Sequence, residues 1–132
     1  MHENDIARTV VLAAYRIHSR LGPGLLESVY EAILAHEIGK AGLPIARQIV
    51  LPIRYEDLTL EEGFRIDLLV ADKVIVELKS VETLAPVHKK QLLTYLRLAD
   101  KRLGLLINFG ARLLREGIVR VVNGLAEEDG SN

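Results

Sequence analysis

The sequence predicts an α/β (α+β) domain in which a central mixed sheet of four to five strands is flanked by helices, in the order α-α-β-β-β-α-β-β. Apolar residues recur at helical spacing over residues 4–40, whereas residues 64–79 alternate with the period of two that is typical of β-strands. The uniformly apolar residues 103–109 follow a third helical pattern. They therefore suit a buried strand that lies parallel to residues 74–79 after a helical crossover.

Two helices are expected before the first strand. Asn4 or Asp5 can cap the first helix, and the Gly22-Pro23-Gly24 segment ends it. The second helix ends near Lys40, with Gly42 as a left-handed cap. Its buried stripe is predicted as Leu26, Val29, Tyr30, Ile33, Leu34 and Ile38.

The strands are expected at residues 45–55, 64–70, 74–79, 103–109 and 117–122. Pro52 lacks an amide donor, so the first strand should lie at an edge of the sheet or carry a bulge. Residues 56–62 are expected to form a turn or a frayed continuation. Pro86 suits the first turn of a third helix that runs to about Ala99. The residues of this helix that should face inward are Val87, Leu92, Leu96 and Ala99.

Residues 64–79 form the hairpin on which the functional prediction depends. If its turn is residues 71–73, Asp67 falls directly opposite Glu77, with Cβ atoms about 5 Å apart. Lys79 projects from the same face one pleat further along. The other face of the second strand should be wholly apolar, with Phe64, Ile66, Leu68 and Val70.

Two facing carboxylates repel each other unless a positive charge lies between them, so this pattern favours a divalent ion such as Mg²⁺ or Mn²⁺. The alternative is a solvated strand face on which Asp67 or Glu77 forms an ordinary ion pair with Lys79.

Other polar residues have both a functional and a structural interpretation. Glu27 lies near a helix N-terminus, where it can simply compensate the helix dipole. Gln91 and Tyr95 lie one turn apart on the third helix, where they can be a surface amide and an aromatic residue at the edge of the core. The most basic region of the chain is either a binding surface or a solvated helix face. It comprises His88, Lys89, Lys90, Arg97, Lys101 and Arg102.

Composition narrows the class of protein. With 132 residues, of which 49% are hydrophobic, the chain can form one domain with a real core, expected over residues 1–124 and followed by a disordered acidic tail at 125–132. The absence of cysteine excludes disulfides and thiolate zinc sites. No transmembrane segment or signal peptide is visible, so a soluble, cytoplasmic protein is expected. A net charge of −1 argues against nonspecific coating of nucleic acid.

With Asp67 and Glu77-x-Lys79 on adjacent strands, the chain resembles the PD-(D/E)XK nuclease superfamily, and within it the GxxExxY proteins. The GxxExxY motif corresponds to residues 24–30, Gly-Leu-Leu-Glu-Ser-Val-Tyr. The likeness extends from about His18 to Asn123, through residues 65–70, 75–79, 91–96 and 104–110. One departure is that Ile66 replaces the proline before Asp67, a position that many members relax.

The resemblance implies a restriction-endonuclease-like core and a role for each matching residue. Asp67 and Glu77 would be metal ligands and Lys79 the catalytic lysine. Glu27 would be the acidic residue of the first core helix, and Gln91 with Tyr95 the Q-x-x-x-Y element of RecB-like nucleases. The predicted catalytic residues are Glu27, Asp67, Glu77, Lys79 and Gln91, and the predicted substrate contacts are Tyr30, His88 and Tyr95.

The leading hypothesis is a Mg²⁺- or Mn²⁺-dependent nuclease that acts on DNA, with RNA as a further candidate substrate. Two alternatives remain: a non-catalytic nucleic-acid-binding or assembly module of the same fold, and a metal-dependent hydrolase of small phosphate esters. A homodimer is also expected, because the strands at residues 45–55 and 117–122 have the character of unpaired sheet edges.

Overall fold

The computed structural model describes residues 1–127, which contain three α-helices, a short 3₁₀-helix and five strands in the predicted order. The helices are α1 (Glu3–Leu21), α2 (Glu27–Lys40), α3 (Pro86–Ala99) and the 3₁₀-helix η1 (Leu114–Gly117). The strands are β1 (Ile45–Tyr55), β2 (Leu58–Val70), β3 (Val74–Lys79), β4 (Leu103–Asn108) and β5 (Ile118–Val122).

The strands form one open mixed sheet in the order β1-β2-β3-β4-β5. All neighbours are antiparallel except β3 and β4, which are parallel and joined by the crossover helix α3. Every residue of β4 is buried, as its uniform apolarity predicted. Strands β1 and β5 are the two edges, so the edge position that Pro52 indicated is confirmed.

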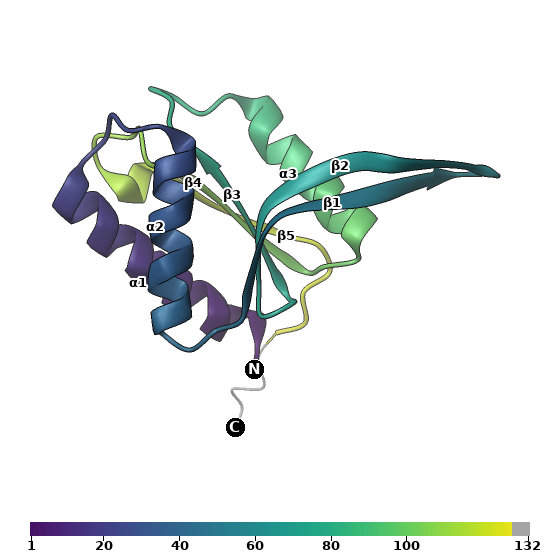
Figure 1. Cartoon of the computed structure of the whole chain (residues 1–132), viewed down its shortest axis with the longest axis horizontal. Helices are drawn as coiled ribbons and strands as arrows, with labels where there is room; N and C mark the ends of the chain where they lie inside the picture. Colours follow the sequence, from purple (N-terminus) through teal and green to yellow (C-terminus); the bar gives the residue numbers. More distant parts are fainter. Residues whose placement is uncertain (128–132) are drawn as a thin grey trace.

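Helices cover both faces of the sheet (Figure 1). Helices α1 and α2 pack on one face, where their apolar residues meet Val76 and Leu78 of β3 and Leu105 of β4. Helix α3 packs on the other face against Ile75 and Leu106. Strand β4 is therefore apolar on both faces, which is why it shows no alternation.

The predicted apolar face of β2 is divided between the two cores. Leu68 and Val70 pack with α1 and α2, whereas Phe64 and Ile66 pack on the α3 side. The change occurs at Asp67, where the β2–β3 ladder has ended at the Leu68–Val76 pair. Beyond this point β2 pairs only with β1, and the β1–β2 hairpin extends away from the body of the molecule (Figure 1).

This hairpin is longer than predicted, because β2 already begins at Leu58 and residues 58–62 are paired with β1. The turn is at residues 56–57, where Glu56 has a left-handed backbone with φ of 55°. The pairing register shifts between Leu51 and Ile53, around Pro52. The bulge that the proline indicated is therefore also present.

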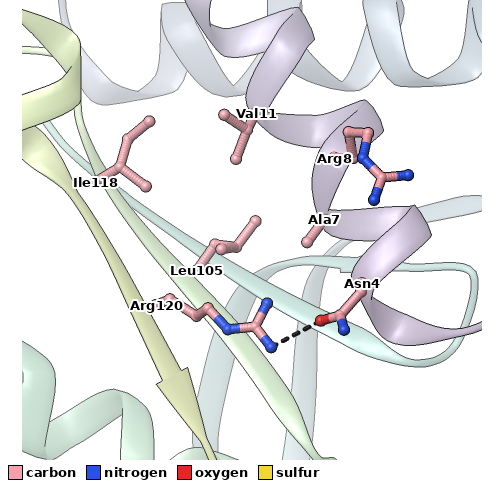
Figure 2. A pocket seen from close by; sticks show the side chains of 7 residues that line it. All are labelled: Asn4, Ala7, Arg8, Val11, Leu105, Ile118 and Arg120. Carbon is pink, nitrogen blue, oxygen red and sulfur yellow. Dashed lines mark hydrogen bonds between the residues drawn. The ribbon is translucent and has the colours of Figure 1, made fainter. Parts of the chain in front are cut away.

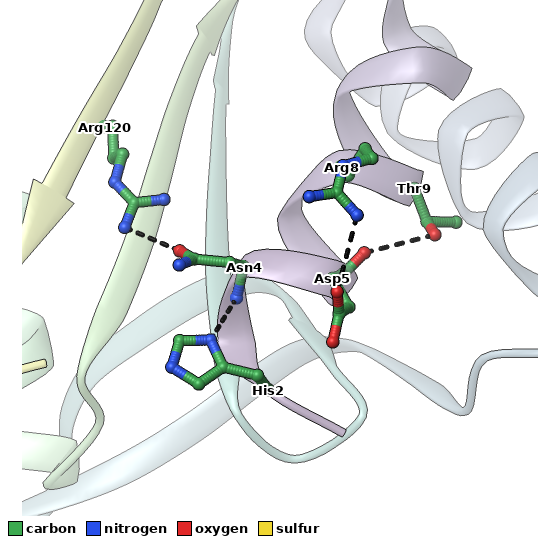
Figure 3. A network of polar contacts seen from close by, with 6 residues as sticks. All are labelled: His2, Asn4, Asp5, Arg8, Thr9 and Arg120. Atoms are coloured by element: carbon green, nitrogen blue, oxygen red, sulfur yellow. Dashed lines mark hydrogen bonds and ion pairs between the residues drawn. The ribbon is translucent and has the colours of Figure 1, made fainter. Parts of the chain in front are cut away.

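Helix α1 begins earlier than predicted, because His2 and not Asn4 or Asp5 is its cap. The Nδ1 atom of His2 accepts a hydrogen bond from the Asn4 amide at 2.9 Å (Figure 3). Arg120 of β5 donates to Asn4 Oδ1 at 2.7 Å, which ties the start of α1 to the edge of the sheet.

The buried stripes of α2 and α3 also differ from the prediction. Leu26 is 73% exposed and Val29 is exposed, while Glu31 and Ala35 are buried instead. Helix α2 therefore presents a face rotated toward Glu31. In α3, Val87 is exposed at the first turn, and Leu92 and Leu96 are the buried residues.

The tail differs from the expected disorder at its beginning. Leu125 packs against the core that α1 and α2 form, and the carbonyl of Ala126 lies 3.1 Å from His2 Nε2. Residues 128–132 of the predicted tail lie outside the described residues. No helix within residues 1–127 has the length and apolarity needed to cross a membrane.

Candidate active site

The β2–β3 hairpin has the predicted register. Val70 pairs with Val74 across the three residues 71–73, and Leu68 pairs with Val76. The same register places Asp67 opposite Glu77, directly beyond the last ladder pair. The predicted apposition of these two residues is therefore confirmed.

Each carboxylate accepts a hydrogen bond from a backbone amide of the opposite strand, in the place where a backbone carbonyl would accept it in a regular ladder. The Asp67 amide donates to Glu77 Oε2 at 2.9 Å, and the Leu78 amide donates to Asp67 Oδ2 at 2.9 Å. Two strong acceptors thus take over from the regular β2–β3 ladder where it ends. One backbone amide therefore orients each of the two carboxylates.

Glu77 is only 8% exposed, and its pKa is raised to about 8. Burial is the largest cause and the negative charge of Asp67 is the second, while the Asp67 amide and the charge of Lys79 act in the opposite direction. Near neutral pH and without a metal, the pair therefore retains a proton. A divalent cation would supply the missing positive charge in place of this proton.

The two carboxylates suit a divalent cation that needs few protein ligands. Within residues 1–127, no group of three or more His, Cys, Asp or Glu side chains is arranged to bind a metal. Mg²⁺ does not need such a group, since it commonly binds through one or two carboxylates and keeps several waters or substrate oxygens. Asp67 and Glu77 fit Mg²⁺ or Mn²⁺ in this way, whereas they do not form an all-protein cage.

Lys79 ends β3 opposite Asn108 of β4 and is half-buried. Asn108 is only 2% exposed, and it fixes the chain that follows Lys79. Its Oδ1 accepts from the amides of Val81 and Gly110 at 3.0 Å, and its Nδ2 donates to the Val81 carbonyl at 2.9 Å. This role was not predicted, although an asparagine that ends a buried apolar strand was a visible signal.

The segment before α2 lies against the end of β3. Ser80 Oγ donates to the Leu25 carbonyl at 2.6 Å, so the N-terminus of α2 begins two residues from a contact with the β3 end. Glu27 is the first residue of α2 and is exposed. This places Glu27 at the helix end that adjoins the strand carrying Glu77 and Lys79.

Tyr30 does not have the predicted substrate contact. Its side chain is fully buried and stacks on Phe109, with ring centroids 4.4 Å apart. Its hydroxyl donates to the Gly22 carbonyl at 2.5 Å and accepts from the Leu25 amide at 3.2 Å. Tyr30 therefore holds the loop before α2, which explains its place in the motif without any contact to substrate.

Helix α3 contributes Tyr95 to the site. Its ring lies against Phe64 at a centroid distance of 4.9 Å, and its pKa is raised by burial and then by the charges of Glu77 and Asp67. The hydroxyl of Tyr95 is therefore close enough for the negative charges of the carboxylate pair to raise its pKa. Gln91 is exposed one turn earlier on the same side of the helix.

His88 and two residues of the basic region already have partners within the protein. His88 Nδ1 accepts from the Ala85 amide at 3.1 Å and so caps α3. Lys101 pairs with Asp72 at 3.3 Å, and Arg102 pairs with Asp100 at 2.9 Å. The positive charge of the predicted basic region is therefore partly neutralised within the protein. The exposed remainder is Lys89, Lys90 and Arg97.

Two hollows of the surface lie near the sheet. One of about 430 Å³ lies between α1 and the β4–β5 edge, and its two arginines already bond Asp5 and Asn4 (Figures 2 and 3). It opens on the face opposite Glu77, so it is not part of the carboxylate site. Another, of about 440 Å³, contains Asn108 and Arg112 and adjoins the chain after Lys79.

Glu31, one turn beyond Glu27 on α2, is a further polar residue that was not predicted. This carboxylate is only 6% exposed and bonds to Arg47 and Gln48 of β1. Its spacing of four residues from Glu27 was a visible signal, since residues four apart share a helix face. The burial of Glu31 could not be seen from that spacing, because the sequence does not say which way the helix is rotated.

The open five-stranded mixed sheet, its three helices and the carboxylate pair on β2 and β3 define an α/β domain with a restriction-endonuclease-like fold. The sequence profile of the PD-(D/E)XK nuclease superfamily matches residues 4–121, and the chain belongs to this superfamily. Its members usually use divalent metal ions, in agreement with the carboxylate pair. No curated protein matches the chain.

The raised pKa of Glu77 predicts how the metal-free protein responds to pH. Between pH 4.5 and about 8 the folded state keeps a proton that the unfolded state has lost, so its free energy of unfolding falls as the pH rises. The contribution of Glu77 is fully present below pH 4.5 and is lost above pH 8. Glu77→Gln cannot ionise and should lack this component, so the variant should become more stable than wild type at pH 8.5.

Urea unfolding in EDTA at pH 5, 6.5 and 8.5 measures this effect. We expect the wild-type stability, relative to Glu77→Gln, to fall by up to about 1.4 kcal/mol per pH unit within the window. Parallel pH profiles for the two proteins would contradict the raised pKa.

Proposed function

We propose that residues 1–124 form a single nuclease domain that hydrolyses phosphodiester bonds of DNA with Mg²⁺ or Mn²⁺ held by Asp67 and Glu77. One observation carries the proposal: two facing carboxylates held by backbone amides at the ladder end, in a chain of this superfamily. Membership of the GxxExxY branch is part of the proposal and is supported by residues 24–30.

The chemistry follows from the positions of the side chains. When bound, a divalent ion at this site supplies positive charge beside the phosphate and lowers the pKa of water. Asp67 and Glu77 hold their places through the strand amides, so little reorganisation is needed when the ion and substrate arrive. Lys79, whose charge acts on Glu77, would offset the negative charge that develops on the phosphoryl oxygens.

Helix α3 would contact the substrate. Tyr95 would stack on a sugar or base beside the carboxylate pair, and Gln91 would orient a water or phosphate. The Nδ1 atom of His88 is occupied by the Ala85 amide, so His88 would contact substrate only through Nε2. Arg112, in the hollow that adjoins the chain after Lys79, would contact a neighbouring phosphate of a polymeric substrate.

Cleavage assays with variants of Asp67 and Lys79 test this function. Single- and double-stranded DNA, RNA and a small phosphate ester are incubated with Mg²⁺, Mn²⁺ or EDTA, and Mn²⁺ affinity is measured separately. Asp67→Asn should lower Mn²⁺ affinity at least about tenfold, because it removes one of two charged ligands. Lys79→Ala should abolish cleavage while sparing or tightening Mn²⁺ binding, because it removes a positive neighbour.

Equal Mn²⁺ affinity in wild type and Asp67→Asn would remove the metal site from the proposal. Cleavage of RNA alone, or of the small ester alone, would reassign the substrate. Binding of nucleic acid without any cleavage would instead support the non-catalytic module.

Glu27→Gln separates a catalytic role from a structural one. If Glu27 only compensates the dipole of α2, the change costs about 0.5 kcal/mol of stability and leaves turnover intact. We expect a catalytic role, because the start of α2 adjoins the end of β3. Losing a carboxylate from the outer surroundings of the metal should lower activity or metal affinity about 10- to 100-fold. Wild-type turnover in folded Glu27→Gln, beside an inactive Lys79→Ala, would assign the residue to the helix alone.

A homodimer is the expected assembly, formed by pairing across one of the two edge strands, β1 or β5. Exposed apolar side chains on these edges, including Val50 and Val122, give such pairing an apolar contact. Sedimentation at micromolar concentration should show the dimer. A monomer throughout this range would rule out the assembly.

A further inference from the structure

Glu31 is a buried carboxylate that the proposed reaction does not use. Among residues 1–127 the buried polar side chains are Glu31, Glu77 and Asn108, and the other two belong to the candidate site. Burying a carboxylate is costly unless it is paired and hydrogen-bonded, so its partners show what it holds. Those partners lie on β1, which runs beside the strand that carries Asp67.

Two consecutive residues of β1 engage the two oxygens of Glu31. Arg47 bonds Oε2 through both Nε and Nη2, at 3.1 and 3.0 Å, which neutralises the charge. Gln48 Nε2 donates to Oε1 at 2.5 Å. The same Gln48 nitrogen lies 3.5 Å from Asp67 Oδ1, at the outer limit of a hydrogen bond. A side-chain amide therefore connects the buried carboxylate of α2 to a proposed metal ligand.

The backbone at Gln48 is adapted to this connection. The β1–β2 register pairs Arg47 with Leu68 and Ile49 with Ile66, so Gln48 lies opposite Asp67. Gln48 has φ of 50°, a left-handed conformation that non-glycine residues rarely adopt within a strand. Such conformations persist where the surrounding structure requires them, and they concentrate at functional sites. Here the conformation accompanies an amide that bonds both carboxylates.

An amide suits this position chemically. Its NH₂ group has two protons, which allows one nitrogen to donate to Glu31 and to Asp67 at the same time. Because the amide is neutral, it can orient Asp67 without adding a positive charge that would compete with a metal. The Leu78 amide holds Asp67 Oδ2 and Gln48 reaches Oδ1, so both oxygens are located while each keeps a lone pair for a ligand.

We propose that Gln48, held in turn by Glu31 and Arg47, is a positioning residue that fixes the carboxylate of Asp67 for metal binding. The inference rests on the function proposed above, in which Asp67 is a metal ligand. In this proposal Glu31 also helps to position Asp67, but only indirectly, because it acts on Asp67 through Gln48.

The test compares Gln48→Gly with Glu56→Gly as a matched control. Both replace a left-handed residue by glycine, which relieves the backbone strain of that conformation, and Glu56 lies in the turn between β1 and β2, at the far end of the hairpin (Figure 1). Exchange of the Leu78 amide proton is measured in the metal-free protein, because this proton bonds Asp67. Mn²⁺ affinity is then measured by titration calorimetry.

We expect faster exchange at Leu78, by about tenfold, and Mn²⁺ binding weakened about 10- to 100-fold in Gln48→Gly but not in Glu56→Gly. Gln48→Asn should behave like Gln48→Gly. Asparagine tolerates the left-handed backbone and keeps the amide, but it is one methylene too short to reach both carboxylates. If Gln48→Gly folds poorly, Gln48→Asn tests the proposal in its place. Unchanged Leu78 exchange, or unchanged affinity in a Mn²⁺-binding protein, would overturn the proposal.

A double variant tests the order of action. If Glu31 acts through Gln48, Glu31→Gln combined with Gln48→Gly should bind Mn²⁺ no more weakly than Gln48→Gly alone. Additive losses would overturn that order. If wild type neither bound Mn²⁺ nor cleaved nucleic acid, the proposed function would fall. Leu78 exchange needs no metal and would still decide whether Gln48 positions Asp67.

Discussion

The site depends on one change in hydrogen bonding: where the β2–β3 ladder ends, Asp67 and Glu77 accept hydrogen bonds from backbone amides of the opposite strand. These hydrogen bonds hold both carboxylates and place them side by side. The pair also keeps a proton near neutral pH, because burial raises the pKa of Glu77 and the charge of Asp67 raises it further. The same arrangement that strains the metal-free protein electrostatically therefore prepares it for a divalent ion.

Buried polar side chains connect this pair to the rest of the fold. Asn108 ties the chain after Lys79 to the end of β4, and Glu31 ties α2 to β1 and, through Gln48, to Asp67. Each of these side chains has its partners, so the burial is compensated. The helices and the outer strands thus act as a frame that holds the central strands, and this is why residues outside the site are expected to affect metal binding.

Much of this arrangement was predictable from local patterns. The order of elements, the parallel crossover through α3, the register of the β2–β3 hairpin and the edge character of β1 all follow from periodicity, turn length and Pro52. The errors on α2 share a cause. The exposed Val29 and the buried Glu31 depend on the rotation of α2 about its axis, which local spacing leaves open because several faces of this helix are apolar.

The sequence by itself determined the fold class and the facing of Asp67 and Glu77, because a strand period of two and a three-residue turn leave a single register in which the hydrophobic pattern is satisfied. Only the tertiary structure decided which core each half of β2 joins and that Gln48 bridges Glu31 to Asp67. These outcomes join residues 31, 48 and 67, which are distant along the chain. Contacts of this kind depend on how the layers pack and on a left-handed residue within a strand, and no local pattern encodes either of them.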